Sequence, residues 1–134
     1  MTNERGGIHD RERAKQQIDY RGLLYGKITP TDIDGLIEYH NKGYILIEAK
    51  LRETIVPNGQ KLAFERLTDD LTRGGKPTLC VIIRHEIDDP TQDIDAVNTT
   101  IREYRWEYKW IIPTYILHTK DAIDNFVYQL DNLS

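Results

Sequence analysis

The fold is decided by residues 33–50, IDGLIEYHNKGYILIEAK. Polar and apolar side chains alternate along Ile33–Tyr39 and again along Tyr44–Lys50, and this period of two predicts two strands. Between them, His40-Asn41-Lys42-Gly43 has the composition of a tight turn. We therefore expect an antiparallel hairpin in this part of the chain.

The alternation also predicts which side chains share a face of the hairpin. Asp34 and Leu36 on the first strand lie on the same side as Leu46, Glu48 and Lys50 on the second. Because Leu36 and Leu46 lie on this face, we expect another apolar part of the protein to cover its middle. The charged groups would then sit at the edge of a covered face, although a solvated face with charged strand ends is the alternative.

The register of the hairpin depends on its turn. A three-residue turn with Gly43 in the left-handed conformation would pair His40 with Tyr44 and leave Asp34 diagonal to Glu48. A shift of two residues would place Asp34 directly opposite Glu48. Either register keeps both carboxylates on one face, because side chains repeat every second residue along a strand.

This grouping of charges has a specific chemistry. Two carboxylates such as Asp34 and Glu48 can hold a divalent cation, Mg²⁺ or Mn²⁺. Lys50 adds a positive charge beside a phosphate held by that cation. The combination points to metal-dependent cleavage of a phosphodiester bond.

The rest of the chain predicts further helices and strands around this hairpin. We expect an α/β fold with a central mixed sheet flanked by helices, because helical and strand patterns are interleaved. The expected segments are a helix over about 11–20, a connection from Leu23 to Thr31, a helix over about 59–73 capped by Asn58, a buried strand Thr78–Ile83, an acidic loop Asp88–Asp95, one strand or a hairpin within Asn98–Ile112, and a helix Asp121–Leu133.

Length and composition are those of a globular protein. The chain has 134 residues, of which 39% are hydrophobic and 30% charged, so we expect a single domain over residues 1–134. No apolar run is long enough to cross a membrane, and Met1–Arg13 does not resemble a secretory signal. The single cysteine, Cys80, lies in an apolar run and is expected to be a buried thiol, which suits a cytoplasmic location. The net charge of -4 counts against strong sequence-independent binding to nucleic acid.

Two segments resemble a known superfamily. TPTDIDG at residues 29–35, followed by ILIEAK at 45–50, is similar to the core of the PD-(D/E)XK nucleases. Gly59-Gln60 at the start of the next helix resembles the glutamine motif of the RecB-like and lambda-exonuclease-like branches, with Phe64 where that motif has Tyr. The similarity covers about residues 10–85. It implies a restriction-endonuclease-like fold with a Holliday-resolvase-like core, and an endonuclease of phage or mobile-element origin that cuts DNA.

The resemblance implies a role for each residue that matches the motif. Asp34, Glu48 and the carbonyl of Ala49 would bind Mg²⁺ or Mn²⁺. Lys50 would orient or activate the attacking water, and Gln60 would hold the substrate phosphate or that water.

Other carboxylates compete for a place in the site. Some members of the superfamily add an upstream helix carboxylate, for which Glu12 is the first candidate and Asp19 the second, unless both are solvated helix charges. The family's proline directly precedes its aspartate, whereas here Thr31 separates Pro30 from Asp32, so Asp32 competes with Asp34.

Substrate contacts are expected from basic side chains near the site. The candidates are Lys61, Arg73 and Lys76. Arg105 and Lys109 form a second patch on an aromatic strand, which carries Tyr104, Trp106, Tyr108 and Trp110. The aromatic strand has a competing interpretation as part of the core or of an interface. Two other functions stay open: a catalytically silent module of this fold that binds nucleic acid or protein, and a dimerisation module. The expected partners are DNA and a second copy or a partner protein, with no membrane.

Overall fold

The structure is a computed structural model that describes residues 15–133. Contacts divide the chain into two units, Met1–Thr31 and Asp32–Ser134, and each is described by itself. In the first unit, Tyr25 and Ile28 form an isolated antiparallel bridge.

The predicted helix over about 11–20 is wrong for residues 16–20, which are not helical, and residues 11–14 lie outside the described part. A helix this short is marginal unless packing against the rest of the fold stabilises it.

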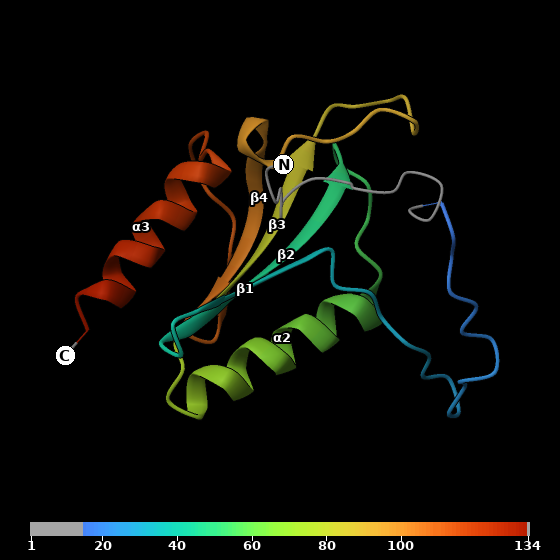
Figure 1. Ribbon diagram of the computed structural model, residues 1–134, viewed down its shortest axis with the longest axis horizontal. Coiled ribbons are helices and arrows are strands. Elements are labelled where there is room, and N and C mark those ends of the chain that lie inside the picture. Colours follow the sequence, from blue (N-terminus) through green and yellow to red (C-terminus); the bar gives the residue numbers. More distant parts are fainter. Residues whose placement is uncertain (1–14, 134) are drawn as a thin grey trace, which may run out of the picture. The chain divides into compact units, whose positions relative to one another are not determined.

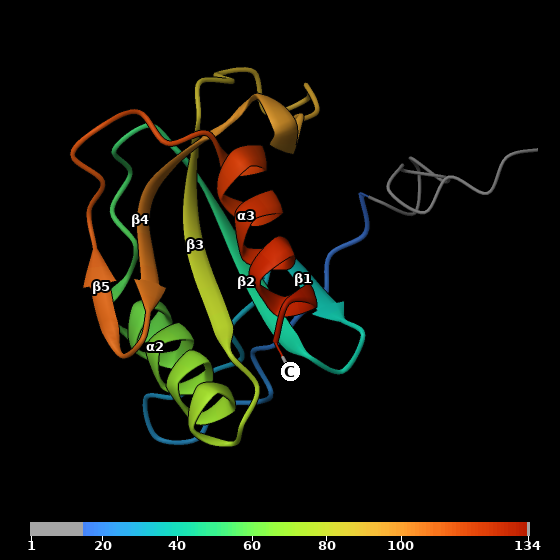
Figure 2. The same ribbon diagram turned by 90° about the vertical axis from the view of Figure 1, so that its left-hand side faces the viewer.

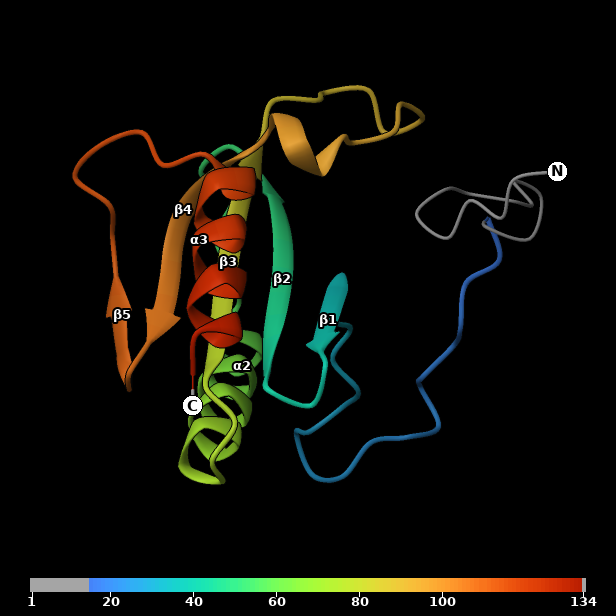
Figure 3. The same cartoon turned by 60° about the vertical axis from the view of Figure 1, so that its left-hand side comes forward.

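The second unit is a five-stranded sheet with one helix on each face (Figure 1). The strands follow the order β1-β2-β3-β4-β5 across the sheet (Figure 3). Only β2 and β3 are parallel, so the sheet is mixed and the α/β class is confirmed. The elements are β1 (Gly35–Tyr39), β2 (Gly43–Leu51), α2 (Asn58–Arg73), β3 (Thr78–His85), a 3-10 turn (Ala96–Asn98), β4 (Thr100–Trp106), β5 (Lys109–Ile111) and α3 (Thr119–Asp131).

The predicted β1–β2 hairpin is present, but its turn differs from the first expectation. His40 and Asn41 are the central residues, with φ of 48° and 59°, and Lys42 N–H donates to the Tyr39 carbonyl at 2.8 Å. Two central residues with positive φ define the turn whose twist matches the flanking strands. Gly43 therefore does not supply the left-handed residue, and the expected pairing of His40 with Tyr44 is wrong.

The observed register is the one shifted by two residues. Gly35 pairs with Ile47 and Leu36 with Leu46. Continuing this register by one residue sets Asp34 beside Glu48. Leu36 is 57% exposed, so the apolar cover that we expected over this face reaches Leu46 but not Leu36.

The two faces of the sheet pack on different helices (Figure 2). On one face, Ile45 of β2 packs with Phe126 and Leu130 of α3. On the other face, Leu46 and Cys80 pack beneath Phe64 of α2. Phe64 is thus a core residue, and Cys80 is fully buried as predicted; burial raises the pKa of its thiol to about 12.

The aromatic strand is a hairpin rather than a single strand. Glu107 and Tyr108 have positive φ and connect β4 to β5. Trp106 meets Phe126 edge to face, with ring centroids 5.3 Å apart, and Trp110 packs beside Phe64. The rings of Trp106 and Trp110 therefore contribute to the core.

The helices agree with the sequence pattern except at their ends. Helix α2 begins at Asn58, and Pro57 rather than Asn58 holds the capping position. Helix α3 runs over Thr119–Asp131, two residues ahead of the predicted span. In residues 15–133, neither helix has the length and apolar character needed to span a bilayer.

Candidate functional site

Three elements bring the candidate site together at one end of β2. Asp34 directly precedes β1, Glu48 and Lys50 lie on β2, and Gln60 is in the first turn of α2. Strand alternation turns Glu48 toward the α2 face of the sheet, beyond Leu46. The short connection after β2 then returns the chain so that α2 starts over this end of the strand.

The side chains converge on the Glu48 carboxylate. Gln60 Nε2 donates a hydrogen bond to Glu48 Oε2. Lys50 Nζ lies 3.5 Å from the same oxygen. Asp34 Oδ2 accepts the main-chain N–H of Ala49 at 2.8 Å, which fixes Asp34 beside the strand that carries Glu48 and Lys50.

Glu48 is an unusual carboxyl group. Its side chain is buried, with 2% of the residue exposed. Burial, followed by the hydrogen bond and the charge repulsion from Asp34, raises the pKa of Glu48 from 4.5 to about 7, although Lys50 acts in the opposite direction. Asp34 therefore makes the ionised form of Glu48 less favourable, because like charges side by side disfavour each other, and Lys50 offsets only part of this effect.

The donor chemistry of this pair fits a hard divalent cation. Mg²⁺ and Mn²⁺ bind carboxylate oxygens, and Mg²⁺ keeps several of its waters when one or two carboxylates hold it. Within residues 15–133, no group of three or more His, Cys, Asp or Glu side chains could hold a metal ion. A cation at this pair would therefore need further ligands from the main chain, from water or from substrate.

Of the other candidate carboxylates, only Asp32 belongs to the same unit as the pair and lies in the described residues. Asp32 is exposed and makes no hydrogen bond within the described residues, whereas Asp34 contacts the site strand. Asp19 is exposed and forms an ion pair with Arg21, with Oδ2 and Nη2 2.7 Å apart. Glu12 lies outside the described residues.

The three basic substrate candidates lie in different places. Lys61 follows Gln60 in α2. Its Nζ atom lies 2.5 Å from Glu103 Oε1 and 4.8 Å from the centre of the Trp110 ring. Arg73 ends α2 and pairs with Asp70 at 2.7 Å. Lys76 Nζ donates to the carbonyl of Asn41, in the turn at the opposite end of β2 from Glu48. Only Lys61 therefore lies near the candidate site.

Sequence reasoning missed a set of polar contacts between α2 and the strands β4 and β5. Arg105 is 9% exposed and donates two hydrogen bonds to Asp69, at 3.0 and 2.7 Å. Trp110 Nε1 donates to Glu65 at 2.9 Å. Glu65 and Asp69 are four residues apart, on one side of α2, and this spacing was the available signal. Because Arg105 is neutralised inside the fold, it is not available as the phosphate contact that we expected.

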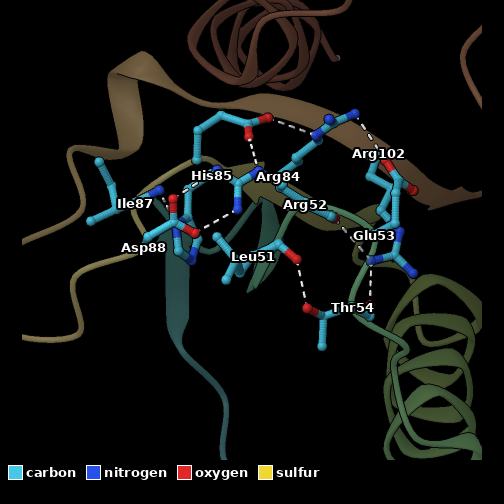
Figure 4. Close-up of polar contacts among 10 residues, drawn as sticks. Leu51, Arg52, Glu53, Thr54, Arg84, His85, Ile87, Asp88 and Arg102 are labelled. Carbon is cyan, nitrogen blue, oxygen red and sulfur yellow. Dashed lines mark hydrogen bonds and ion pairs between the residues drawn. The ribbon is translucent and has the colours of Figure 1, made fainter.

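A second polar network follows the ends of β2 and β3 (Figure 4). Arg52 pairs with Asp88 at 2.6 Å and with Glu86 at 2.7 Å. Arg84 pairs with Glu53 at 2.8 Å. His85 Nδ1 accepts a hydrogen bond from the main-chain N–H of Ile87 at 3.1 Å, so this side chain satisfies a main-chain donor just after the end of β3.

Comparisons with protein-family models, with curated proteins and with solved structures gave no match.

Proposed function

We propose that this protein is a divalent-metal-dependent nuclease that hydrolyses phosphodiester bonds of DNA, with a PD-(D/E)XK-like, restriction-endonuclease-like core. The observation that carries the proposal is the convergence of Asp34, Lys50 and Gln60 on the buried Glu48 carboxylate. A structural role alone does not account for a carboxyl group whose pKa is raised to about 7 by burial and then by a second carboxyl group beside it.

The proposed roles follow from the chemistry of each side chain. Asp34 and Glu48 would hold Mg²⁺ or Mn²⁺, with the carbonyl of Ala49 as a third protein ligand. The bound cation would stabilise negative charge on the attacked phosphate. Lys50, as a cation beside this position, would orient the attacking water and stabilise charge as it develops on phosphorus. Gln60 would place the phosphate or the water by hydrogen bonding.

The deciding experiment is calorimetric titration of Mn²⁺ into the wild type, Asp34→Ala and Asp32→Ala. We expect Asp34→Ala to bind Mn²⁺ at least about tenfold more weakly, because half of the carboxylate pair is lost. Asp32→Ala is the matched control, since it removes an exposed carboxylate two residues away, and its affinity should equal that of the wild type. Equal affinity in all three proteins would refute the metal site.

A DNA-cleavage assay then distinguishes a nuclease from a catalytically silent binding module of similar fold. With Mg²⁺, the wild type should cut supercoiled and linear DNA, whereas Lys50→Ala should keep its affinity for Mn²⁺ and lose cleavage by about a hundredfold or more. Lys120→Ala, which removes an exposed lysine on α3, is the control for lost positive charge. A wild type that binds metal but leaves DNA intact would favour the binding module.

A further inference from the structure

Arg102 on β4 makes its side-chain hydrogen bonds to main-chain carbonyl groups. Its Nη1 donates to the main-chain carbonyl of Thr54 at 2.5 Å and is 3.4 Å from that of Arg52 (Figure 4). Within residues 15–133, no carboxylate forms an ion pair with Arg102, although the side chain is half-buried. By contrast, Arg84 and Arg105 each pair with carboxylates. A half-buried guanidinium with open donors favours an anionic ligand.

The side chain borders a hollow that can accept such a ligand. The hollow has a volume of about 410 Å³, and Arg84, Arg102 and Thr100 are among the residues that line it. Two carboxylates also line it, but Glu53 is paired with Arg84 at 2.8 Å and Glu103 with Lys61 at 2.5 Å. Arg102 is therefore the arginine of this lining that has no carboxylate partner within residues 15–133.

Part of the lining of the hollow is apolar and exposed. Ile112, Tyr115 and Ile116 belong to the connection between β5 and α3, and they are 70%, 67% and 76% exposed. The Tyr115 hydroxyl makes no hydrogen bond within the described residues. Next to a cation, such a wall suits a ligand that is anionic at one end and has a flat apolar part at the other.

The hollow lies next to the candidate site. Arg84, in its wall, pairs in register with Lys50 on the neighbouring strand. Glu103, also in its wall, is bound to Lys61, which follows Gln60 on α2. A strand of nucleic acid with one phosphate at Glu48 would have a further nucleotide within reach of the hollow.

We propose that this hollow binds a second phosphodiester of the substrate strand, with Arg102 on the phosphate and the adjoining sugar and base against Tyr115. The inference rests on the proposed function, because it takes the substrate to be a nucleic acid strand that also reaches Glu48. The main-chain contacts of Arg102 hold its guanidinium in place before the ligand arrives, which reduces the entropy lost on binding.

The test is fluorescence anisotropy of a short labelled single-stranded oligonucleotide, measured at several salt concentrations in Ca²⁺ and in EDTA. Arg102→Gln should weaken binding roughly five- to twentyfold and reduce the salt slope by about one. Arg66→Gln is its control, since Arg66 is exposed on α2 and has no contact with the hollow.

Arg102 also holds the loop after β2, so Arg102→Gln could weaken binding by disturbing that loop. A second variant, Tyr115→Ala, removes no hydrogen bond. Tyr128→Ala is the control for Tyr115, because Tyr128 is 68% exposed on α3 and lies outside the hollow.

The outcomes separate this inference from the proposed function. Weaker binding by both hollow variants, with both controls unchanged, supports the second phosphate site even if the Mn²⁺ titration gives no metal site. Wild-type binding by Tyr115→Ala together with an unchanged salt slope for Arg102→Gln overturns it, even if metal binding and cleavage are both found.

Discussion

The groups around Glu48, on β2, shift the pKa of its carboxyl group in opposite directions. Its carboxylate is buried and lies beside a second carboxylate, but it also accepts a hydrogen bond from Gln60 and lies 3.5 Å from the Lys50 ammonium. Burial and repulsion outweigh the lysine, so the pKa of Glu48 rises to about 7. The charged form of this residue is therefore unfavourable in the folded protein unless a cation joins it.

This pKa gives the first prediction, for protein kept in EDTA. The unfolded chain has the ordinary pKa of 4.5 and the folded protein one of about 7, so folding favours the protonated form. The contribution of Glu48 to stability is complete below pH 4.5 and is lost as the pH rises to 7. Between these values, the free energy of unfolding of the wild type should fall by roughly 1–3 kcal/mol relative to that of Glu48→Gln.

Urea denaturation of both proteins at several pH values measures this difference. Glu107→Gln, in the exposed β4–β5 turn, is the matched control and should follow the wild type. Parallel pH profiles for the wild type and Glu48→Gln would show that the pKa of Glu48 is not raised.

The grouping of the site residues could be predicted because it depends on local periodicity. Alternation places Asp34, Glu48 and Lys50 on one face in either register, and the start of a helix places Gln60 near the strand end. The choice between registers could not be made, because it depends on positive φ at His40 and Asn41. The partners of Lys61 could not be predicted either, since Glu103 lies on a strand that is distant in sequence.

Between elements, the contact of α2 with β4 depends on a buried ion pair. Asp69 holds Arg105 through two hydrogen bonds, and Glu65 is a more distant partner at 3.6 Å. Asp69→Ala should lower the free energy of unfolding by about 2–4 kcal/mol, because it leaves a buried guanidinium without its main partner. Chemical denaturation measures the change.

Asp70→Ala is the control for this prediction. Asp70 is the next residue on α2, its side chain is 72% exposed, and it pairs with Arg73. An exposed pair of this kind contributes little, so the change should be below about 1 kcal/mol. Equal effects of the two substitutions would mean that the Arg105 pair is not what joins α2 to β4.

Gly43, where β2 begins, provides a second prediction between elements. A Cβ at this position would collide with the carbonyl of Pro77 and lie 2.9 Å from a methyl group of Leu130. Gly43→Ala should therefore destabilise the protein by about 1–3 kcal/mol through overpacking. In α2, Gly59→Ala meets nothing within 4 Å and should be neutral or stabilising. Thermal unfolding of both variants tests the contrast, and a neutral Gly43→Ala would contradict the close approach.

Secondary-structure type was more predictable than boundaries and pairings. The helices over 59–73 and 121–133 were expected from apolar spacing, and the structure places them within two residues. Asn58 was assigned to the cap because of its side chain, but Pro57 occupies that position. The β4–β5 hairpin stayed undecided, because Glu107 and Tyr108 are not typical residues for positive φ.

For the whole molecule, the charge distribution limits how it can bind nucleic acid. The net charge is -4, and Lys61, Arg73 and Arg105 are already paired with carboxylates. Few phosphates can then be neutralised, so DNA binding should be weak in EDTA, stronger in Ca²⁺, and only modestly dependent on salt. Anisotropy titrations at several salt concentrations test this expectation. Tight binding in EDTA with a steep salt slope would contradict it and would favour the binding-module alternative.

The parallel pairing of β2 with β3 has a consequence for the rate at which the chain folds. The β1–β2 and β4–β5 turns join neighbouring strands, and such hairpins form in about 1–10 μs. The β2–β3 pair forms only after the chain has closed a loop that contains all of α2, which makes this step slower. Phe64 packs on both strands, so Phe64→Leu should slow refolding, whereas Ile111→Val in β5 should mainly speed unfolding. Stopped-flow tryptophan fluorescence separates the two, and an unchanged refolding rate for Phe64→Leu would mean that α2 docks after the rate-limiting step.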